Sequence, residues 1–126
     1  MSNPAPGYAS HPDHQVKISA PEHAVTLRRG SSLVARTERA VLLEETGYPA
    51  RYYLPMADFT DGMLASSDSQ TYCPFKGEAS YWHVDIDGEK LENAVWGYDS
   101  PYDECLGLRG YRGFYAEHFD METKGS

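Results

Sequence analysis

The dipeptide Asp87-Gly88 is the feature that most constrains how this chain folds. An Asp-Gly pair between two alternating runs is the strongest short-range signal for a two-residue β-hairpin turn, because both residues tolerate a positive φ angle. The runs on either side are residues 79–86 and 89–98, which alternate apolar and polar side chains. The sequence therefore predicts two neighbouring antiparallel strands joined at this turn.

Counting outward from the turn predicts the register of the hairpin and the composition of its two faces, because successive side chains on a strand point to opposite faces. The predicted pairs are Ile86 with Glu89, Val84 with Leu91, Trp82 with Asn93, Ala79 with Trp96 and Gly77 with Tyr98. One face holds an apolar stripe that we expect to enter the core: Trp82, Val84, Ile86, Leu91 and Val95. The other face is polar near the turn and aromatic at the far end, with Tyr81, Trp96 and Tyr98.

The chain from residue 16 onward has the pattern of an all-β domain, with short apolar and aromatic runs separated by Gly, Pro, Asn or Asp. Short helical turns are predicted within residues 56–64 and 101–108, and Cys105 is expected to pack inside the second. The fold class that follows is mainly β with one or two short helical turns. Further strands are predicted over residues 25–29, 33–36, 40–44, 50–54 and 110–116.

The length of 126 residues favours a single domain. Residues 1–14 are rich in Pro, Ser, Gly and Ala and show no apolar period, so we expect a flexible N-terminal arm. Residues 15–120 form the expected domain, and residues 121–126 form an expected flexible C-terminus.

The net charge limits the classes of binding partner that we expect, and the cysteine content indicates the cellular compartment. Lys and Arg number 11 against 19 Asp and Glu, and the net charge of -8 disfavours binding to nucleic-acid polymers and to anionic membranes. Cys73 and Cys105 form no CxxC pair, which predicts two free thiols in a reducing compartment. No apolar run is long enough for a membrane helix, and the first residues lack a signal-peptide pattern. We expect a cytoplasmic protein without a metal or other cofactor, and the sequence leaves its oligomeric partners open.

Residues 71–77, TYCPFKG, combine a thiol, a cation and an aromatic ring on a backbone constrained by Pro74 and Gly77. The thiolate is the reactive form of cysteine and a nearby cation favours it, so Cys73 and Lys76 are candidate catalytic residues. This segment leads into the first hairpin strand, so the predicted pairing brings it beside the aromatic end of the hairpin.

Five motifs in this chain are similar, in order and spacing, to the bacterial and fungal family called domain of unknown function 427. The resemblance covers about residues 16–120, and the CP[YF]KG element is its most specific part. The motifs are ARYYLP (50–55), TYCPFKG (71–77), ASYW (79–82), AVWGYDSP (94–101) and RGYRGFYAE (109–117).

The resemblance implies a β-tent fold, in which two antiparallel sheets meet at a steep angle. The family carries a nucleotidyltransferase-like heading that names no established reaction. Relatives with this fold commonly hold a structural zinc between paired CxxC motifs, and this chain has none, so no zinc is expected. Phe75 stands where many family members have Tyr. The family pattern marks Arg51, Tyr53, Cys73, Lys76, Gly77, Tyr81, Trp96, Tyr98 and Tyr115.

We expect these residues to form a pocket for a small planar or anionic molecule. A nucleotide-like molecule is one option, because bases stack on aromatic rings and cations bind phosphate. The alternation in residues 50–54 sends Arg51 and Tyr53 to one face and Tyr52 and Leu54 to the other. Two alternatives stay open: a thiol-dependent enzyme that uses Cys73, and a non-catalytic interaction module. The expected ligand-binding residues are Arg51, Tyr53, Tyr81, Trp96, Tyr98 and Tyr115, with Lys76 as a second cation.

Overall fold

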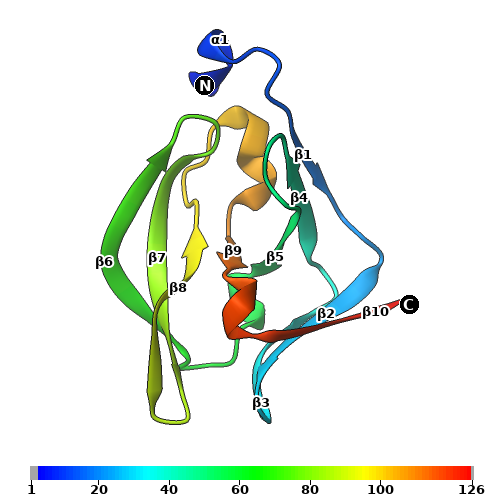
Figure 1. The fold of residues 1–126 in the computed structure, drawn as a ribbon, viewed down its shortest axis with the longest axis vertical. Helices are drawn as coiled ribbons and strands as arrows, with labels where there is room; N and C mark the ends of the chain where they lie inside the picture. Colours follow the sequence, from blue (N-terminus) through cyan, green and yellow to red (C-terminus); the bar gives the residue numbers. More distant parts are fainter. Residues whose placement is uncertain (1–2, 126) are drawn as a thin grey trace.

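The computed structural model describes residues 3–125, which form two antiparallel sheets and four short helical segments (Figure 1). The larger sheet holds, in spatial order, β1 (Val16–Ser19), β4 (Val41–Glu45), β5 (Arg51–Pro55), β9 (Tyr111–Phe114), β8 (Glu89–Gly97), β7 (Gly77–Ile86) and β6 (Leu64–Cys73). The smaller sheet holds β10 (Asp120–Gly125), β2 (His23–Arg29) and β3 (Ser32–Thr37). The helical segments are α1 (Gly7–Ser10), η1 (Met56–Asp58), η2 (Asp103–Leu108) and η3 (Ala116–His118).

The mainly β class with two antiparallel sheets is confirmed, and the helical turns η1 and η2 lie within the two ranges predicted for them. Cys105 is fully buried in η2, as expected of a packing residue. Among residues 3–125, no helix has both the length and the apolar character that crossing a membrane requires.

The larger sheet has a hydrophobic cluster on each face, because its strands alternate. Leu54 of β5 packs with Val84 of β7 and with Val25 and Val34 of the smaller sheet, so this first core lies between the two sheets. The neighbouring Tyr53 belongs instead to a second cluster. The alternation predicted for residues 50–54 is therefore confirmed. The second cluster contains Leu43, Tyr53, Ala79, Trp96, Tyr98, Cys105 and Leu108.

The predicted hairpin is present, but its register holds only near the turn. Ile86 pairs with Glu89 and Val84 with Leu91, and both turn residues have positive φ angles. Beyond this point Trp82 pairs with Val95, so the predicted pairs of Trp82 with Asn93, Ala79 with Trp96 and Gly77 with Tyr98 are wrong by two residues.

The cause of the shift is a bulge in β8 at Asn93, whose φ angle is 51° and whose backbone N–H donates a hydrogen bond to Nδ1 of His83, 3.0 Å away. Asn tolerates this left-handed conformation better than most residues. Since two is an even number, the bulge leaves Val95 with the first core and Trp96 and Tyr98 with the second cluster, on their predicted faces. The apolar stripe and the aromatic end of the hairpin are therefore as expected.

Strand β6 has no counterpart among the predicted strands. Its sequence, LASSDSQTYC, is mostly polar and exposed, and it lies at the edge of the sheet, where only one neighbour is needed. Backbone hydrogen bonds to β7 hold it, and these leave no mark in the hydrophobic pattern. The predicted reactive segment is the loop of this β6–β7 hairpin, because Cys73 pairs with Gly77.

Both ends of the chain carry more structure than the expected flexible segments 1–14 and 121–126. Strand β10 extends the smaller sheet by pairing with β2 from Asp120 to Gly125, so β9 is not the last strand. At the other end, α1 lies against the β6–β7 loop, where the Gly7 N–H donates a hydrogen bond to the Pro74 carbonyl at 3.0 Å. Composition alone could not reveal either contact, because each depends on a distant backbone partner. Residues 1, 2 and 126 lie outside the described residues.

Gly113 of β9 lies between two large rings on neighbouring strands. It pairs with Tyr53 of β5 on one side and with Trp96 of β8 on the other. A Cβ atom at this position would lie only 2.6 Å from the indole ring of Trp96. The absent side chain therefore leaves the space that the indole occupies.

We predict that Gly113→Ala lowers the free energy of unfolding by about 1–3 kcal/mol, because the added methyl group overpacks the indole. Gly107→Ala is the matched control, since its Cβ would meet Ile18 at 3.5 Å, an ordinary contact. Urea unfolding followed by circular dichroism measures both. Equal stability of the two variants would contradict the packing described here.

Candidate functional site

A cavity of about 480 Å³ opens on the face of the larger sheet that carries the second cluster. It brings together all eight residues named as site candidates from the sequence: Arg51, Tyr53, Cys73, Lys76, Tyr81, Trp96, Tyr98 and Tyr115. Six of them lie in β5, β6, the β6–β7 loop, β7 and β8. The other two are Tyr98, which directly follows β8, and Tyr115, which directly follows β9. The structure adds residues that the sequence did not indicate, above all His14 and Glu45.

The aromatic wall of the cavity is built around Trp96 and Tyr53. The indole Nε1–H donates a hydrogen bond to the Tyr53 hydroxyl at 3.0 Å, and the two rings are nearly perpendicular with centroids 6.1 Å apart. Burial raises the pKa of Tyr53 above its ordinary value, which the Trp96 hydrogen bond and then Arg51 oppose. Tyr53 is therefore a neutral phenol at physiological pH, held in place by the indole.

Tyr98 belongs to the same hydrophobic cluster as Trp96 and Tyr53 but takes no part in their hydrogen bond. Its side chain is buried, and burial raises its pKa, so its hydroxyl is also protonated. Within residues 3–125, the Tyr98 hydroxyl has no hydrogen-bond partner and is not sealed from solvent. Tyr98 lines the cavity, and its hydroxyl is a hydrogen-bond donor without a partner among the described residues.

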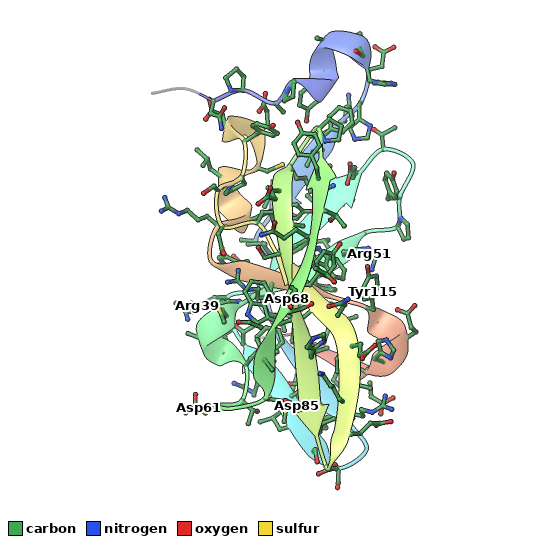
Figure 2. The ribbon with its side chains drawn as sticks, turned by 90° about the vertical axis from the view of Figure 1, so that its left-hand side faces the viewer. Arg39, Arg51, Asp61, Asp68, Asp85 and Tyr115 are labelled. Carbon is green, nitrogen blue, oxygen red and sulfur yellow. The ribbon has the colours of Figure 1, made fainter. Side chains whose placement is uncertain are left out.

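Arg51 provides a cation whose charge is not matched by an acid. Its guanidinium carbon lies 5.4 Å from the centroid of the Trp96 ring and 6.0 Å from that of Tyr115. Figure 2 shows Arg51 and Tyr115 next to each other. No carboxylate of the described residues lies within 4.0 Å of this guanidinium. The ring faces hold it by cation–π attraction and leave its N–H groups free to bind an anion.

Lys76, the second expected cation, differs from Arg51 because it has a carboxylate partner. Its ammonium forms an ion pair with Oε1 of Glu45, and the side chains of these residues are only 9% and 7% exposed. The other oxygen of Glu45 lies 2.8 Å from Nε2 of His14. The positive charge of Lys76 is therefore compensated inside the protein, and the pair ties the β6–β7 loop to the end of β4.

The β6–β7 loop also contacts the segment before β1. The Phe75 ring stacks on the His14 imidazole, with centroids 3.9 Å apart and an interplanar angle of 21°. Gly7 fits under the same ring, where a Cβ atom would lie 2.7 Å from it. His14 thus forms part of the cavity wall, and Gly7 packs against the Phe75 ring that lines it. No spacing or motif connects His14 with Glu45 in the sequence, so only the folded chain reveals them.

The two cysteines differ in their surroundings. Cys73 is half-buried at the cavity, with its Sγ 3.8 Å from Nζ of Lys76. Burial raises the pKa of Cys105 to about 11, against an opposing effect of Lys76. Cys105 is therefore a packing residue, and Cys73 is the thiol that a ligand in the cavity would meet.

Within the part of the chain that the structure describes, no three His, Cys, Asp or Glu side chains gather as a metal site requires. The groups that are present suit binding by stacking, by hydrogen bonds from phenols and by one guanidinium.

A family model described as domain of unknown function 427 matches residues 17–125. The matched range contains all eight candidate residues, and it begins after His14. No curated protein matches this chain. Because the description of the family names no reaction, any proposal about function has to come from the cavity.

We predict that Cys105 resists alkylation in the folded protein. At pH 8 a thiol with a pKa of about 11 is about 0.1% thiolate, and only the thiolate reacts. In the Cys73→Ser variant, the rate with iodoacetamide, measured by mass spectrometry, should rise steadily from pH 7 to pH 10. The urea-unfolded variant is the control and should level off near its free pKa of ~8.5. A plateau below pH 9 in the folded protein would contradict the burial of Cys105.

We predict that Glu45→Gln lowers the free energy of unfolding by about 3–5 kcal/mol, because it leaves the buried Lys76 ammonium without its counter-charge. The double variant Glu45→Gln/Lys76→Met should recover most of this loss. Glu38→Gln is the control, since Glu38 pairs with Arg36 at 4.0 Å on the exposed surface and should change little. If Glu45→Gln unfolds at the same urea concentration as Glu38→Gln, the ion pair does not have this structural role.

Proposed function

This chain belongs to the family called domain of unknown function 427, and from the cavity that the family motifs line we propose that the domain binds a small, planar, anionic molecule. The observation that carries the proposal is Arg51. A guanidinium with no carboxylate partner among the described residues, placed over the faces of Trp96 and Tyr115, is a site for one anionic group.

The remaining walls support a flat ligand. Trp96, Tyr81, Tyr98 and Tyr115 present ring surfaces around a cavity of about 480 Å³, a size in the range of small-molecule pockets. The free hydroxyl of Tyr98 adds a hydrogen-bond donor. An aromatic anion would stack on the partly exposed rings of Tyr81 and Tyr115 and place its charged group against Arg51.

The pairing of Lys76 limits how much negative charge the ligand carries. Since Glu45 compensates Lys76, the cavity offers one uncompensated cation instead of two. The whole chain has a formal net charge of -8, which disfavours polyanions. A carboxylate or a single phosphate group fits this balance better than a polyphosphate chain.

A thiol-dependent activity is the second candidate, and the contact between Cys73 and Lys76 favours it. Their Sγ and Nζ atoms are 3.8 Å apart at the cavity, so an ammonium lies beside the thiol. In that case the Cys73 thiol would be required in addition to the rings and Arg51 that hold the ligand. The two candidates share the binding site and differ in whether Cys73 is required.

We predict that orotate, a planar carboxylate, binds the full chain with a Kd below ~1 mM, as measured by isothermal titration calorimetry at pH 7. Arg51→Met should weaken binding at least ~10-fold. Arg39→Met is the matched control, because Arg39 is exposed, pairs with Asp58 at 3.4 Å and does not line the cavity. Cys73→Ser should bind orotate as the parent chain does.

Two outcomes would overturn the proposal. One is the absence of orotate binding up to ~10 mM, and the other is equal affinity of the Arg51→Met and Arg39→Met variants. A loss of binding in Cys73→Ser with Arg51→Met unaffected would favour the thiol-dependent candidate.

A further inference from the structure

We propose that the ligand carries a hydroxyl-rich, sugar-like group, and that this group occupies a second hollow that continues the cavity. This inference rests on the proposed function and names the class of ligand. The second hollow has a volume of about 580 Å³ and shares Tyr81 and Tyr115 with the cavity. Its other lining residues are Ser69, Gln70, Thr71, Glu92, Asn93, Glu117 and His118.

The second hollow is shaped by two bulges on the strands that flank β7. In β6, four residue steps from Ser66 to Gln70 oppose two steps on β7, and the register shifts between them. In β8, a similar excess lies between Leu91 and Val95. Bulges redirect side chains and are common beside binding and catalytic sites. Here two of them occur at the same level of the sheet.

A hydrogen-bond network joins the two bulges. The Asn93 side-chain N–H donates to Oγ of Ser69 at 3.0 Å, and the Ser67 hydroxyl donates to the side-chain Oδ1 of Asn93. The Asn93 backbone N–H donates to His83. Asn93 holds this arrangement despite its φ angle of 51°. The network therefore fixes the frame of the hollow instead of leaving its rim to thermal motion.

The groups that the network leaves available have the chemistry of a polyol site. Gln70, Glu92 and Glu117 are exposed, and within residues 3–125 their side chains form no hydrogen bond or ion pair. Carboxylates and amides bind neighbouring hydroxyl groups, as a carboxylate does with the hydroxyls of ribose in dinucleotide sites. Two carboxylates also repel a second anionic group. The hollow thus suits a neutral, hydroxyl-bearing group.

The boundary between the cavity and the second hollow orients such a ligand. Tyr115 contacts Arg51 on the cavity side, while Glu117, two residues later, lines the hollow. Burial raises the pKa of Tyr115, and so does the neighbouring Tyr81, while Arg51 opposes them, so Tyr115 is a neutral phenol at this boundary. The positive end of the site holds the anion and the acidic end holds the sugar.

The test compares orotate with orotidine, the same planar carboxylate carrying a ribose, by isothermal titration calorimetry on the full chain. Orotidine should bind at least ~10-fold more tightly than orotate. Glu92→Gln/Glu117→Gln should abolish this gain and leave the Kd of orotate unchanged. Glu38→Gln/Glu122→Gln, with the same change in charge at positions outside both hollows, should retain the gain.

Each outcome separates this inference from the proposed function. If orotate binds through Arg51 and orotidine binds no better, the sugar site is wrong and the proposed function stands. If Glu92→Gln/Glu117→Gln still binds orotidine more tightly than orotate, the ribose lies elsewhere and the inference is wrong. If neither compound binds, both proposals fall.

Discussion

The missing side chain at Gly113 is the constraint on which the cavity depends. Gly113 pairs with Tyr53 and with Trp96 across three adjacent strands, and the indole fills the space that any Cβ would take. This position lets the indole N–H reach the Tyr53 hydroxyl, which fixes the ring. The fixed ring in turn holds the Arg51 guanidinium by its face. One glycine thereby positions both the aromatic wall and the cation of the site.

The two cations of the candidate site differ in whether an acidic side chain compensates their charge. Lys76 and Glu45 compensate each other in the interior, and Glu45 also contacts His14. These three residues connect the β6–β7 loop, the end of β4 and the segment before β1, so the ion pair joins distant parts of the chain. His14 precedes the matched family range, which means that residues outside that range complete the wall. Arg51 has no such partner among the described residues, so its charge is uncompensated within them.

Much of the fold and the candidate site could be predicted from local patterns. Alternation placed Arg51 with Tyr53 and assigned both faces of the hairpin, and the family motifs named eight residues that line one cavity. The register failed at Asn93, because a bulge is stabilised by a side chain on the neighbouring strand. Strand β6 was missed for a related reason: its serines carry no hydrophobic period, and the pairing with β7 uses backbone groups that every residue has.

The sequence by itself determined which side chains share a face, because strand geometry sets that through the spacing of near neighbours. It also determined the hairpin turn and, by family resemblance, the set of candidate residues. Only the tertiary structure decided that Lys76 is compensated by Glu45, that His14 completes the wall, and that two bulges open a second hollow. These features depend on contacts between residues far apart in the chain, and such contacts form only when the sheets have assembled.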